Sequence, residues 1–312
     1  MPKIAAVICT YDRYDVLEKA IDSLRQQTLS KDIYEVIVID NLPSTQNFKH
    51  YSELFHNKDN IRYMAEPMAG LSSARNRGLA ECRSDIIAYM DDDAIAANTW
   101  LAEILTAFEL YGDAAGIVGG RVRPIWDVPR PPWLDDTMLG HLSVVDWGGE
   151  NARIAESAEW FAGTNISYRA ALLREHGGFT LGLGRNGQTA SLLGNEEIAV
   201  TNSIRDAGYL AIYAPDVVVD HLVPLSRLNR GWFRKRAAWQ AVSDFLMQDH
   251  AADANALEAW EGLVKYISSL PPEERSLRGL FHATDKSDQF RWQTSTVYDM
   301  TRILLSKFEL PE

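Results

Sequence analysis

The sequence predicts an α/β protein in which a doubly wound sheet is flanked by helices, followed by a helical C-terminal extension. Two observations support this prediction. Over the first 120 residues, short continuous apolar runs alternate with segments of helical periodicity, and polar or charged residues follow directly after three of the apolar runs. Strands covered on both faces have continuous apolar sequences, and their alternation with helices through short links is typical of a parallel sheet.

The elements of this first half follow from its periodicity. Strands are expected over 3–10, 34–40, 61–66 and 85–93, each a short apolar run. Apolar residues at helical spacing predict a helix after the first strand, and the other helices are expected over 71–82 and from Trp100 to Phe108. The residues that carry the first helical pattern are Val16, Leu17, Ala20, Ile21 and Leu24.

The second half is less regular. Residues 124–150 are rich in Pro and Trp and predict an irregular surface segment. Residues 158–179 predict an aromatic strand, a Gly-Thr-Asn turn and a helix that ends at Gly177 and Gly178. A glycine-rich loop, a helix that begins near Asn195 and strands that end at His221 are expected next, and the chain is mostly helical from about Leu225.

Composition limits the classes of function. The 312 residues carry a formal net charge of −12, which argues against sequence-independent nucleic-acid binding because phosphates are bound by surplus Lys and Arg. Two cysteines, Cys9 and Cys82, give no disulfide framework and suit a reducing compartment. No stretch reaches the roughly 20 apolar residues of a membrane span, and the N-terminal apolar run is too short for a signal peptide. A cytoplasmic location is expected.

The ends of the strands carry the unusual residues. The first strand ends in Thr10–Arg13, the second in Asp40 and Asn41, and the fourth in Asp91–Asp93. In doubly wound sheets ligands bind at the carboxyl ends of the strands. The three adjacent carboxylates are either a solvated turn or a site for one hard divalent cation, and their position at this edge favours the cation.

A second acidic pair and a histidine complete the candidate site. Glu196 and Glu197 open a predicted helix, where they either serve as helix-terminal charges or provide a general base. The glycine-rich residues 181–194 before them are able to bring backbone close to a substrate. His221 follows a strand, and its side chain is either structural or a metal ligand.

The order of the motifs resembles the family 2 glycosyltransferases of the GT-A fold. The matching segments, over roughly residues 3–225, are VICTYDR, VIVIDN, EPMAGLSSARNRG, AYMDDDA, FAGTNISYR, GNEEIAV and PDVVVDH. The resemblance implies a GT-A type mixed sheet in a domain over 1–225, divided into a nucleotide-binding half (1–120) and an acceptor-binding half (121–225). Residues 226–312 would form the helical C-terminal extension.

The resemblance also implies a nucleoside diphosphate sugar donor, foremost a UDP-sugar, and Mn²⁺ or Mg²⁺. Asp91 and Asp93 match the DxD motif: Asp93 is expected to bind the metal, and Asp91 the ribose or the metal. His221 matches a histidine that completes the shell of the metal or of the diphosphate. Tyr11 is expected to stack on the base, and Asp40 to contact the base or ribose. The residues expected to bind the nucleotide sugar are Thr10, Tyr11, Arg13, Asp40, Arg75, Asp91 and Asp92.

The family reaction inverts the anomeric carbon, so the resemblance implies a carboxylate base for the acceptor hydroxyl. Glu197 lies where the family has its catalytic Asp, and Glu196 precedes it and stays an alternative base. The acceptor is a glycan, a lipid-linked sugar or a small molecule. The residues expected near it are Gly163, Thr164, Asn165 and Trp160, with Trp126, Trp133 and Trp147 as either an aromatic platform or packing.

The tail and the alternatives stay open at this point. Residues 227–240 combine five basic and three aromatic residues, which suggests a solvated helix face, a diphosphate contact or peripheral docking on the inner face of a membrane. A homodimer through the C-terminal helices is conceivable. A noncatalytic nucleotide-sugar or carbohydrate-binding protein and a sugar nucleotidyltransferase are the alternative functions, although no glycine-rich triphosphate loop follows the first strand. A dinucleotide dehydrogenase is disfavoured because GxGxxG is absent there.

Overall fold

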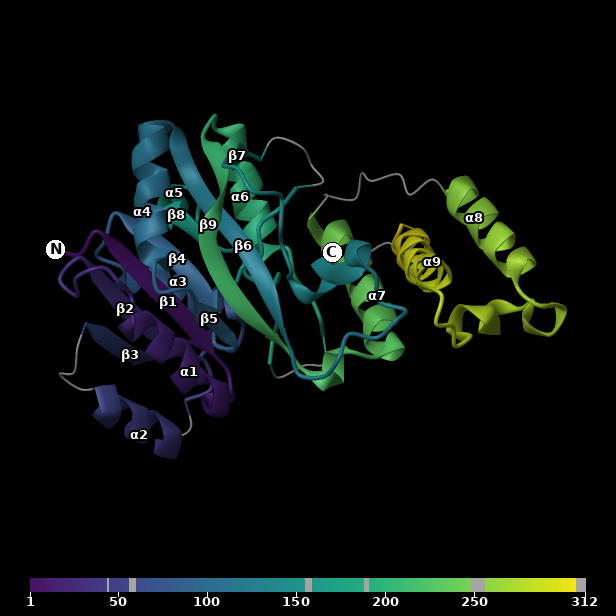
Figure 1. The fold of residues 1–312 in the computed structure, drawn as a ribbon, viewed down its shortest axis with the longest axis horizontal. Coiled ribbons are helices and arrows are strands. Elements are labelled where there is room, and N and C mark those ends of the chain that lie inside the picture. The colour runs from purple at the N-terminus through teal and green to yellow at the C-terminus, as the bar shows by residue number, and fades with distance from the viewer. Residues whose placement is uncertain (44, 56–59, 155–158, 188–190, 248–255, 307–312) are drawn as a thin grey trace. The chain divides into compact units, whose positions relative to one another are not determined.

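The computed structural model describes residues 1–43, 45–55, 60–154, 159–187, 191–247 and 256–306 (Figure 1). The chain forms two units. The first comprises Met1–Ile125, Ser143–Ala190 and Glu196–Leu222, and the second comprises Trp126–Leu142, Ser191–Asn195 and Val223–Glu312. The second unit therefore takes in two short segments that precede the C-terminal extension in the sequence.

Within the described residues, the first unit is built on one mixed sheet of nine strands, in the order β3-β2-β1-β4-β8-β6-β9-β5, with β7 beside β9. Strands β1 to β4 are parallel, and β8 joins β4 in the antiparallel sense. The strands are β1 (Ile4–Thr10), β2 (Tyr34–Asp40), β3 (Ile61–Ala65), β4 (Ile86–Asp91), β5 (Ala94–Ala96), β6 (Ala115–Trp126), β7 (Ala152–Arg153), β8 (Ile166–Arg169) and β9 (Leu210–Val223).

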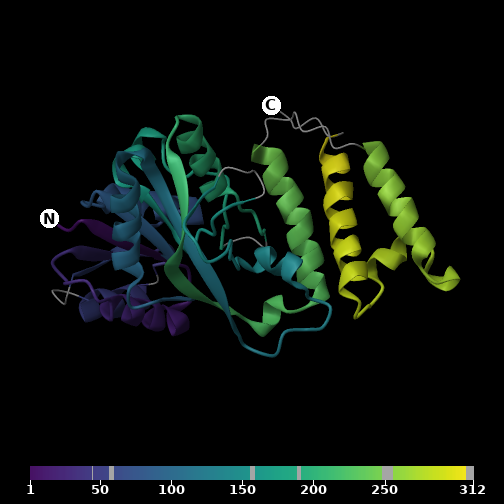
Figure 2. The same cartoon turned by 45° about the horizontal axis from the view of Figure 1, so that its top comes forward.

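Helices cover both faces of this sheet, which explains the continuous apolar strands (Figures 1 and 2). Alternate residues of β1 enter two different cores: Ile4 packs with Leu17 and Trp100 on one face, and Ala5 packs with Leu79 on the other. The helices are α1 (Tyr14–Arg25), α2 (Thr45–Phe55), α3 (Leu71–Glu81), α4 (Trp100–Tyr111), α5 (Ala170–Glu175) and α6 (Glu196–Asp206).

The predicted α/β class and sheet are confirmed, and one predicted element is wrong. The aromatic strand expected before the Gly-Thr-Asn turn does not form, because residues 159–162 have no regular structure. The strand, β8, follows the turn instead, and α5 ends at Gly177 and Gly178, both with positive φ, as expected. Aromatic content alone misplaced this strand, since Phe161 is a core residue of the loop.

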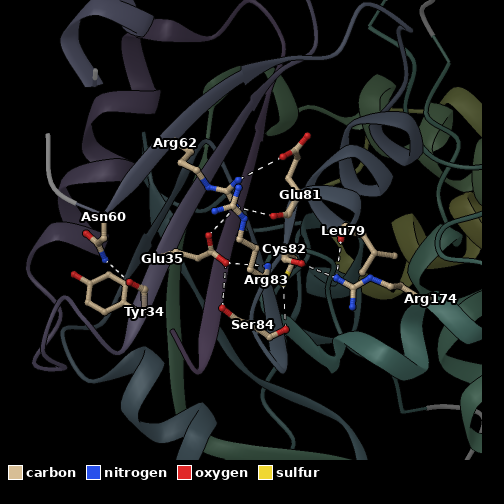
Figure 3. A network of polar contacts seen from close by, with 10 residues as sticks. All are labelled: Tyr34, Glu35, Asn60, Arg62, Leu79, Glu81, Cys82, Arg83, Ser84 and Arg174. Atoms are coloured by element: carbon tan, nitrogen blue, oxygen red, sulfur yellow. Dashed lines mark hydrogen bonds and ion pairs between the residues drawn. The ribbon is translucent and has the colours of Figure 1, made fainter. Parts of the chain in front are cut away.

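A polar network lies at the amino edge of the sheet, opposite the strand ends that carry the candidate site (Figure 3). Arg62 Nη2 donates to Glu35 Oε2 at 2.7 Å and to the carbonyl of Glu81 at 2.7 Å. Arg174 Nη2 donates to the carbonyls of Leu79 and Cys82. The two guanidinium groups thus satisfy carbonyls at the end of α3, where a helix attracts cations. Arg62 joins this end of α3 to β3, and Arg174 joins it to α5.

Gly120 of β6 is expected to be intolerant of any side chain. A Cβ there would lie 1.9 Å from the carbonyl oxygen of Val217 in β9, and this backbone atom cannot move aside. We expect Gly120→Ala to destabilise the fold by about 1–3 kcal/mol or more, measured by thermal unfolding. Gly149→Ala is the matched control, because its Cβ meets open space. Equal melting temperatures for the two variants would contradict this.

The second unit is helical and has its own apolar cores. Trp133 packs edge-on against Phe233 and Phe290, with ring centroids 5.3 and 4.8 Å away. Figures 1 and 2 show α7 and α9 side by side. The helices are α7 (Arg230–Met247), α8 (Ala256–Ser269) and α9 (Ser287–Leu305), and short 3₁₀ turns in the two units cover Gly112–Ala114, Asp136–Leu142, Leu225–Arg227, Pro272–Glu274 and Leu277–Phe281.

In the described part of the chain, no helix has the length and apolarity that crossing a bilayer requires.

Candidate active site

The strand register brings the predicted polar residues to one edge of the sheet. Thr10 is paired with Asp40 across β1 and β2, and Cys9 with Asp91 across β1 and β4. Because these strands are parallel, their last residues share the carboxyl edge. The antiparallel pairing of β5 with β9 then places Ala94 opposite His221, so the histidine reaches the acidic run from the other half of the sheet.

Asp91, Asp93 and His221 form a cluster of possible metal ligands. Each offers one ligand atom, and these atoms all lie within 4.8 Å of one another. Asp93 and His221 are buried, with Asp93 Oδ1 3.3 Å from His221 Nε2. The amide of Leu222 donates to the carbonyl of Asp93 at 2.9 Å, which holds the two chain segments together.

Asp92 lies outside this cluster and contacts Thr10 and Arg13 instead. Its carboxylate accepts a hydrogen bond from Thr10 Oγ1 at 2.8 Å and lies 3.1 Å from Arg13 Nη1. Burial raises the pKa of Asp92 to about 7, although Arg13 opposes this effect. The other guanidinium nitrogen, Arg13 Nη2, is 2.6 Å from Asp93 Oδ2, so one half-exposed arginine balances two of the three acids.

Arg75 links the acidic run to the second acidic pair. Its Nη1 lies 2.7 Å from Glu196 Oε1 and its Nη2 lies 3.6 Å from Asp91 Oδ1. The side chain is buried, and the guanidinium sits over the rings of Tyr89 and Phe179. Burial alone would lower the pKa of Arg75, but the two carboxylates raise it. Arg75 was expected to bind the nucleotide, whereas in the structure it pairs with protein acids.

Glu196 and Glu197 differ in their surroundings. Glu196 is buried and held by Arg75, whereas Glu197 is partly buried at the start of α6. Burial and then the charge of Glu196 raise the pKa of Glu197 to about 8, while Arg75 lowers it. Among the described residues, Oε2 of each glutamate is buried without a hydrogen-bond partner. A carboxylate that keeps one free oxygen is able to accept a proton from a substrate.

The glycine-rich segment approaches this pair, as its composition suggests. Ser72 Oγ donates to the carbonyl of Leu183 at 2.8 Å. Gly184 has a φ of 82°, and a Cβ there would lie 3.0 Å from the Glu196 carboxyl carbon. A Cβ at Gly187 would likewise lie 2.3 Å from a ring carbon of Tyr11, so this glycine leaves room for the tyrosine ring. Residues 188–190 of the predicted loop lie outside the described residues.

Asp40 is fully buried rather than open to a nucleotide. Its Oδ2 accepts hydrogen bonds from Tyr63 at 2.7 Å and Tyr14 at 3.0 Å, and its Oδ1 accepts one from the amide of Leu42. Burial and Asp40 raise the pKa of both tyrosines. In this conformation the carboxylate organises the turn after β2, and the contact of Asp40 with the base or ribose stays a prediction.

The residues of the Gly-Thr-Asn turn, which were expected near the acceptor, contact other protein groups in the interior. Asn165 is buried: its Nδ2 donates to the carbonyls of Arg121 and Val217, and its Oδ1 accepts from Trp100. Buried Thr164 accepts from the amide of Asp91 at 3.2 Å. Gly163 leaves room for Arg75, since a Cβ there would lie 2.3 Å from Nη2. This turn therefore positions Asp91 and Arg75, and its contact with an acceptor stays a prediction.

The tryptophans divide between exposure and packing. Trp133 is core in the second unit, so the platform interpretation is wrong for it. Trp147 and Trp160 are partly exposed, and Trp147 Nε1 donates to the carbonyl of Trp160 at 3.0 Å. Trp126 is also partly exposed, at the end of β6.

The basic stretch 227–240 has internal partners. Arg230 Nη2 donates to the carbonyl of Thr284 and to Asp285 Oδ1, both at 2.6 Å. Arg234 donates to the carbonyl of Leu280 and to Gln293. These two arginines fix the helices of the second unit, and a membrane contact through 227–240 stays a prediction.

Sequence reasoning missed the pairing of Arg75 with Glu196, which lie 121 positions apart. The sequence held one local signal for the burial of Arg75: it lies in a predicted helix among small residues, in a segment that precedes an apolar strand. A buried arginine needs a charged or polar partner. The sequence offered no comparable signal for its partner.

Known proteins share this chain's sequence pattern and fold. The sequence profile described as "Glycosyl transferase family 2" matches residues 5–177. Glucosyl-dolichyl phosphate glucuronosyltransferase of Haloferax volcanii is 27% identical over 262 residues, 81% of each chain. Succinoglycan biosynthesis protein ExoM of Rhizobium meliloti is 26% identical over 231 residues, 73% of this chain and 70% of its own.

Solved structures share the fold. The mannosyltransferase PcManGT from Pyrobaculum calidifontis, in complex with GDP-Man and Mn²⁺, aligns with a TM-score of 0.63 at 19% identity, over 98% of this chain and 87% of its own. S. aureus TarS 1-349 in complex with UDP-GlcNAc aligns with a TM-score of 0.55 at 15% identity, over 97% and 91%. The chain has the GT-A fold, and it belongs to glycosyl transferase family 2.

Proposed function

We propose that this protein is an inverting glycosyltransferase that moves a sugar from a nucleoside diphosphate sugar to an acceptor hydroxyl, with a divalent metal and a glutamate base. The proposal rests on one observation: Arg75 contacts both the acidic run, at Asp91, and the acidic pair, at Glu196. One group, with His221, offers metal ligands, and the other contains a carboxyl group that suits general-base work. All of these residues belong to the first unit.

The ligand set fits Mn²⁺ or Mg²⁺. Two carboxylates and one imidazole would hold the ion, since carboxylate oxygens suit both metals and a histidine nitrogen is compatible with Mn²⁺. A bound cation would neutralise the diphosphate of the donor and the charge of the leaving group. Mn²⁺ accompanies a nucleotide sugar in the mannosyltransferase structure, which supports the same combination here.

Glu197 is the proposed base. Its carboxylate accepts the proton of the acceptor hydroxyl while that oxygen attacks the anomeric carbon, and the bond from this carbon to the diphosphate breaks on the opposite face. Glu196 is bound to Arg75 and serves to hold that cation beside Asp91. Arg13 is the residue free to exchange its acidic partners for donor phosphate, because its side chain is 37% exposed.

The acceptor is proposed to be lipid-linked. The Haloferax relative, which matches 81% of this chain, is named for a glucosyl-dolichyl phosphate acceptor. The donor is proposed to be a UDP-sugar, as in TarS, and GDP is the competing base because PcManGT binds GDP-Man.

Nucleoside diphosphates are expected to stabilise the protein only together with the metal. A ligand at 100 times its Kd adds about 2.7 kcal/mol to the free energy of unfolding. The measurement is a thermal-shift panel of UDP, GDP, TDP and CDP, with and without Mn²⁺. Asp93→Asn should abolish the metal-dependent shift, and Asp113→Asn, whose carboxylate is exposed, should retain it. A shift of equal size without metal would overturn the proposed metal site.

A further inference from the structure

The five residues that precede the acidic pair are held by the helical unit. Ser191–Asn195 belong to the second unit, whereas Glu196 opens α6 in the first. The amide of Gly194 donates to Ser243 Oγ at 3.0 Å, and Ser243 is fully buried in α7. The backbone that delivers Glu196 and Glu197 is therefore fixed at its last residues by α7.

Asn195 has a positive φ, and both ends of its side-chain amide are hydrogen-bonded. Its φ is 72°, a left-handed conformation that Asn tolerates better than most residues do. Its Nδ2 donates to Asp244 Oδ1 at 2.6 Å, and its Oδ1 accepts from Gln240 Nε2 at 3.0 Å. The side chain is buried, so both ends of the amide are bound to α7.

Asp244 is in turn held from a second helix. Tyr298 of α9 donates its hydroxyl to Asp244 Oδ2 at 2.7 Å, and Gln240 also donates to Oδ1 at 2.8 Å. Burial and the hydrogen bond to Asp244 raise the pKa of Tyr298 to about 12, so the hydroxyl stays protonated and remains a donor. Buried polar networks that are satisfied in this way rigidify the groups they join.

We propose that Asp244, Gln240 and Tyr298 are positioning residues of the transfer reaction: through Asn195 they fix the backbone from which the catalytic glutamate projects. The inference rests on the proposed function, since it needs a base in the pair Glu196 and Glu197. A network of this kind matters for rate, because a displacement of about 1 Å at a reacting group costs about 100-fold.

The test uses paired variants of the full chain. Tyr298→Phe removes the hydroxyl that holds Asp244. Tyr266→Phe is the matched control, because it removes a buried hydroxyl of the same unit that donates to the carbonyl of Gly279 at 2.8 Å and comes from α8, whereas the Asn195 network is built from α7 and α9. Asn195→Gly keeps the left-handed backbone accessible but removes both amide contacts.

The readouts are the kcat and KM of nucleoside diphosphate release from the donor, and amide hydrogen exchange of residues 191–200. Tyr298→Phe should lower kcat about 3–10-fold and Asn195→Gly about 10–100-fold. In both variants the donor KM should stay unchanged and exchange over 191–200 should become faster. Tyr266→Phe should retain the wild-type kcat.

Three outcomes would overturn the inference alone: equal kcat losses in the two tyrosine variants, a wild-type kcat in Asn195→Gly, or faster exchange without any loss of kcat. A wild-type protein that turns over no nucleotide sugar would overturn the proposed function and, with it, this inference.

Discussion

Glu197→Gln should lower kcat about 10²–10⁴-fold while nucleotide binding stays intact. The amide is nearly isosteric with the carboxyl group but cannot take a proton from the acceptor hydroxyl, and general-base catalysis contributes a factor of this size. The residue lies outside the proposed metal cluster, and Arg75 pairs with its neighbour Glu196. The measurement combines steady-state kinetics with the metal-dependent thermal shift given by UDP or GDP.

Two further variants distinguish the role of Glu197 from that of Glu196. Glu197→Asp should keep part of the activity, because it retains a base set back by one methylene. Glu196→Gln should instead lower the melting temperature, since it leaves the buried Arg75 short of its partner at 2.7 Å. A large kcat loss in Glu196→Gln at a wild-type melting temperature, with full activity in Glu197→Gln, would make Glu196 the base.

The same assignment fixes the sign of the pH dependence. Burial and the charge of Glu196 raise the pKa of Glu197 to about 8, and a base acts only when it is ionised. The value of kcat/KM, which reports groups of the free enzyme, should therefore rise with pH and level off above about 8. Glu197→Gln should lose this rise. A profile that is flat between pH 6 and 9 in the wild type would contradict the assignment.

The fold was predictable because its signals are local. The apolar runs that end at Thr10, Asp40 and Asp91 coincide with β1, β2 and β4, and parallel strands place such ends at one edge. From the sequence alone, the same rule placed Asp91 and Asp93 at this edge, where the structure has them in the cluster of possible metal ligands. His221 was predictable only through the family motif, because its approach depends on the antiparallel pairing of β9 with β5.

The roles of individual polar residues were less predictable, because hydrogen-bond partners are set by tertiary contacts. Asn165 was expected to face the acceptor, yet its amide bonds Arg121, Val217 and Trp100 in the interior. The partners of Asn195 lie 45 and 49 positions away, on a helix beyond the recognised family motifs. Periodicity predicts which face of a helix is apolar, but it does not say which distant side chain pairs with a buried amide.

Arg75→Met should lower the free energy of unfolding by about 3–5 kcal/mol, the usual result of removing one partner from a buried ion pair. The guanidinium is the charged partner of Glu196 at 2.7 Å, and both side chains are 4% exposed. Its replacement fills similar space but leaves the carboxylate without its cation. The double variant Arg75→Met with Glu196→Gln should recover most of the loss, because no unpaired buried charge remains; urea unfolding of all four proteins gives the coupling energy.

The loss in Arg75→Met should also shrink as the pH falls. Without the cation, the buried carboxylate of Glu196 is uncompensated, and burial favours the neutral over the charged form of a carboxyl group. A variant that buries such a group loses stability as rising pH ionises it. The difference from wild type should therefore be smaller near pH 5 than near pH 8, whereas the double variant should show no such trend. A difference that is constant over this range would mean that Arg75 stabilises the fold through its packing on Tyr89 and Phe179 rather than through its charge.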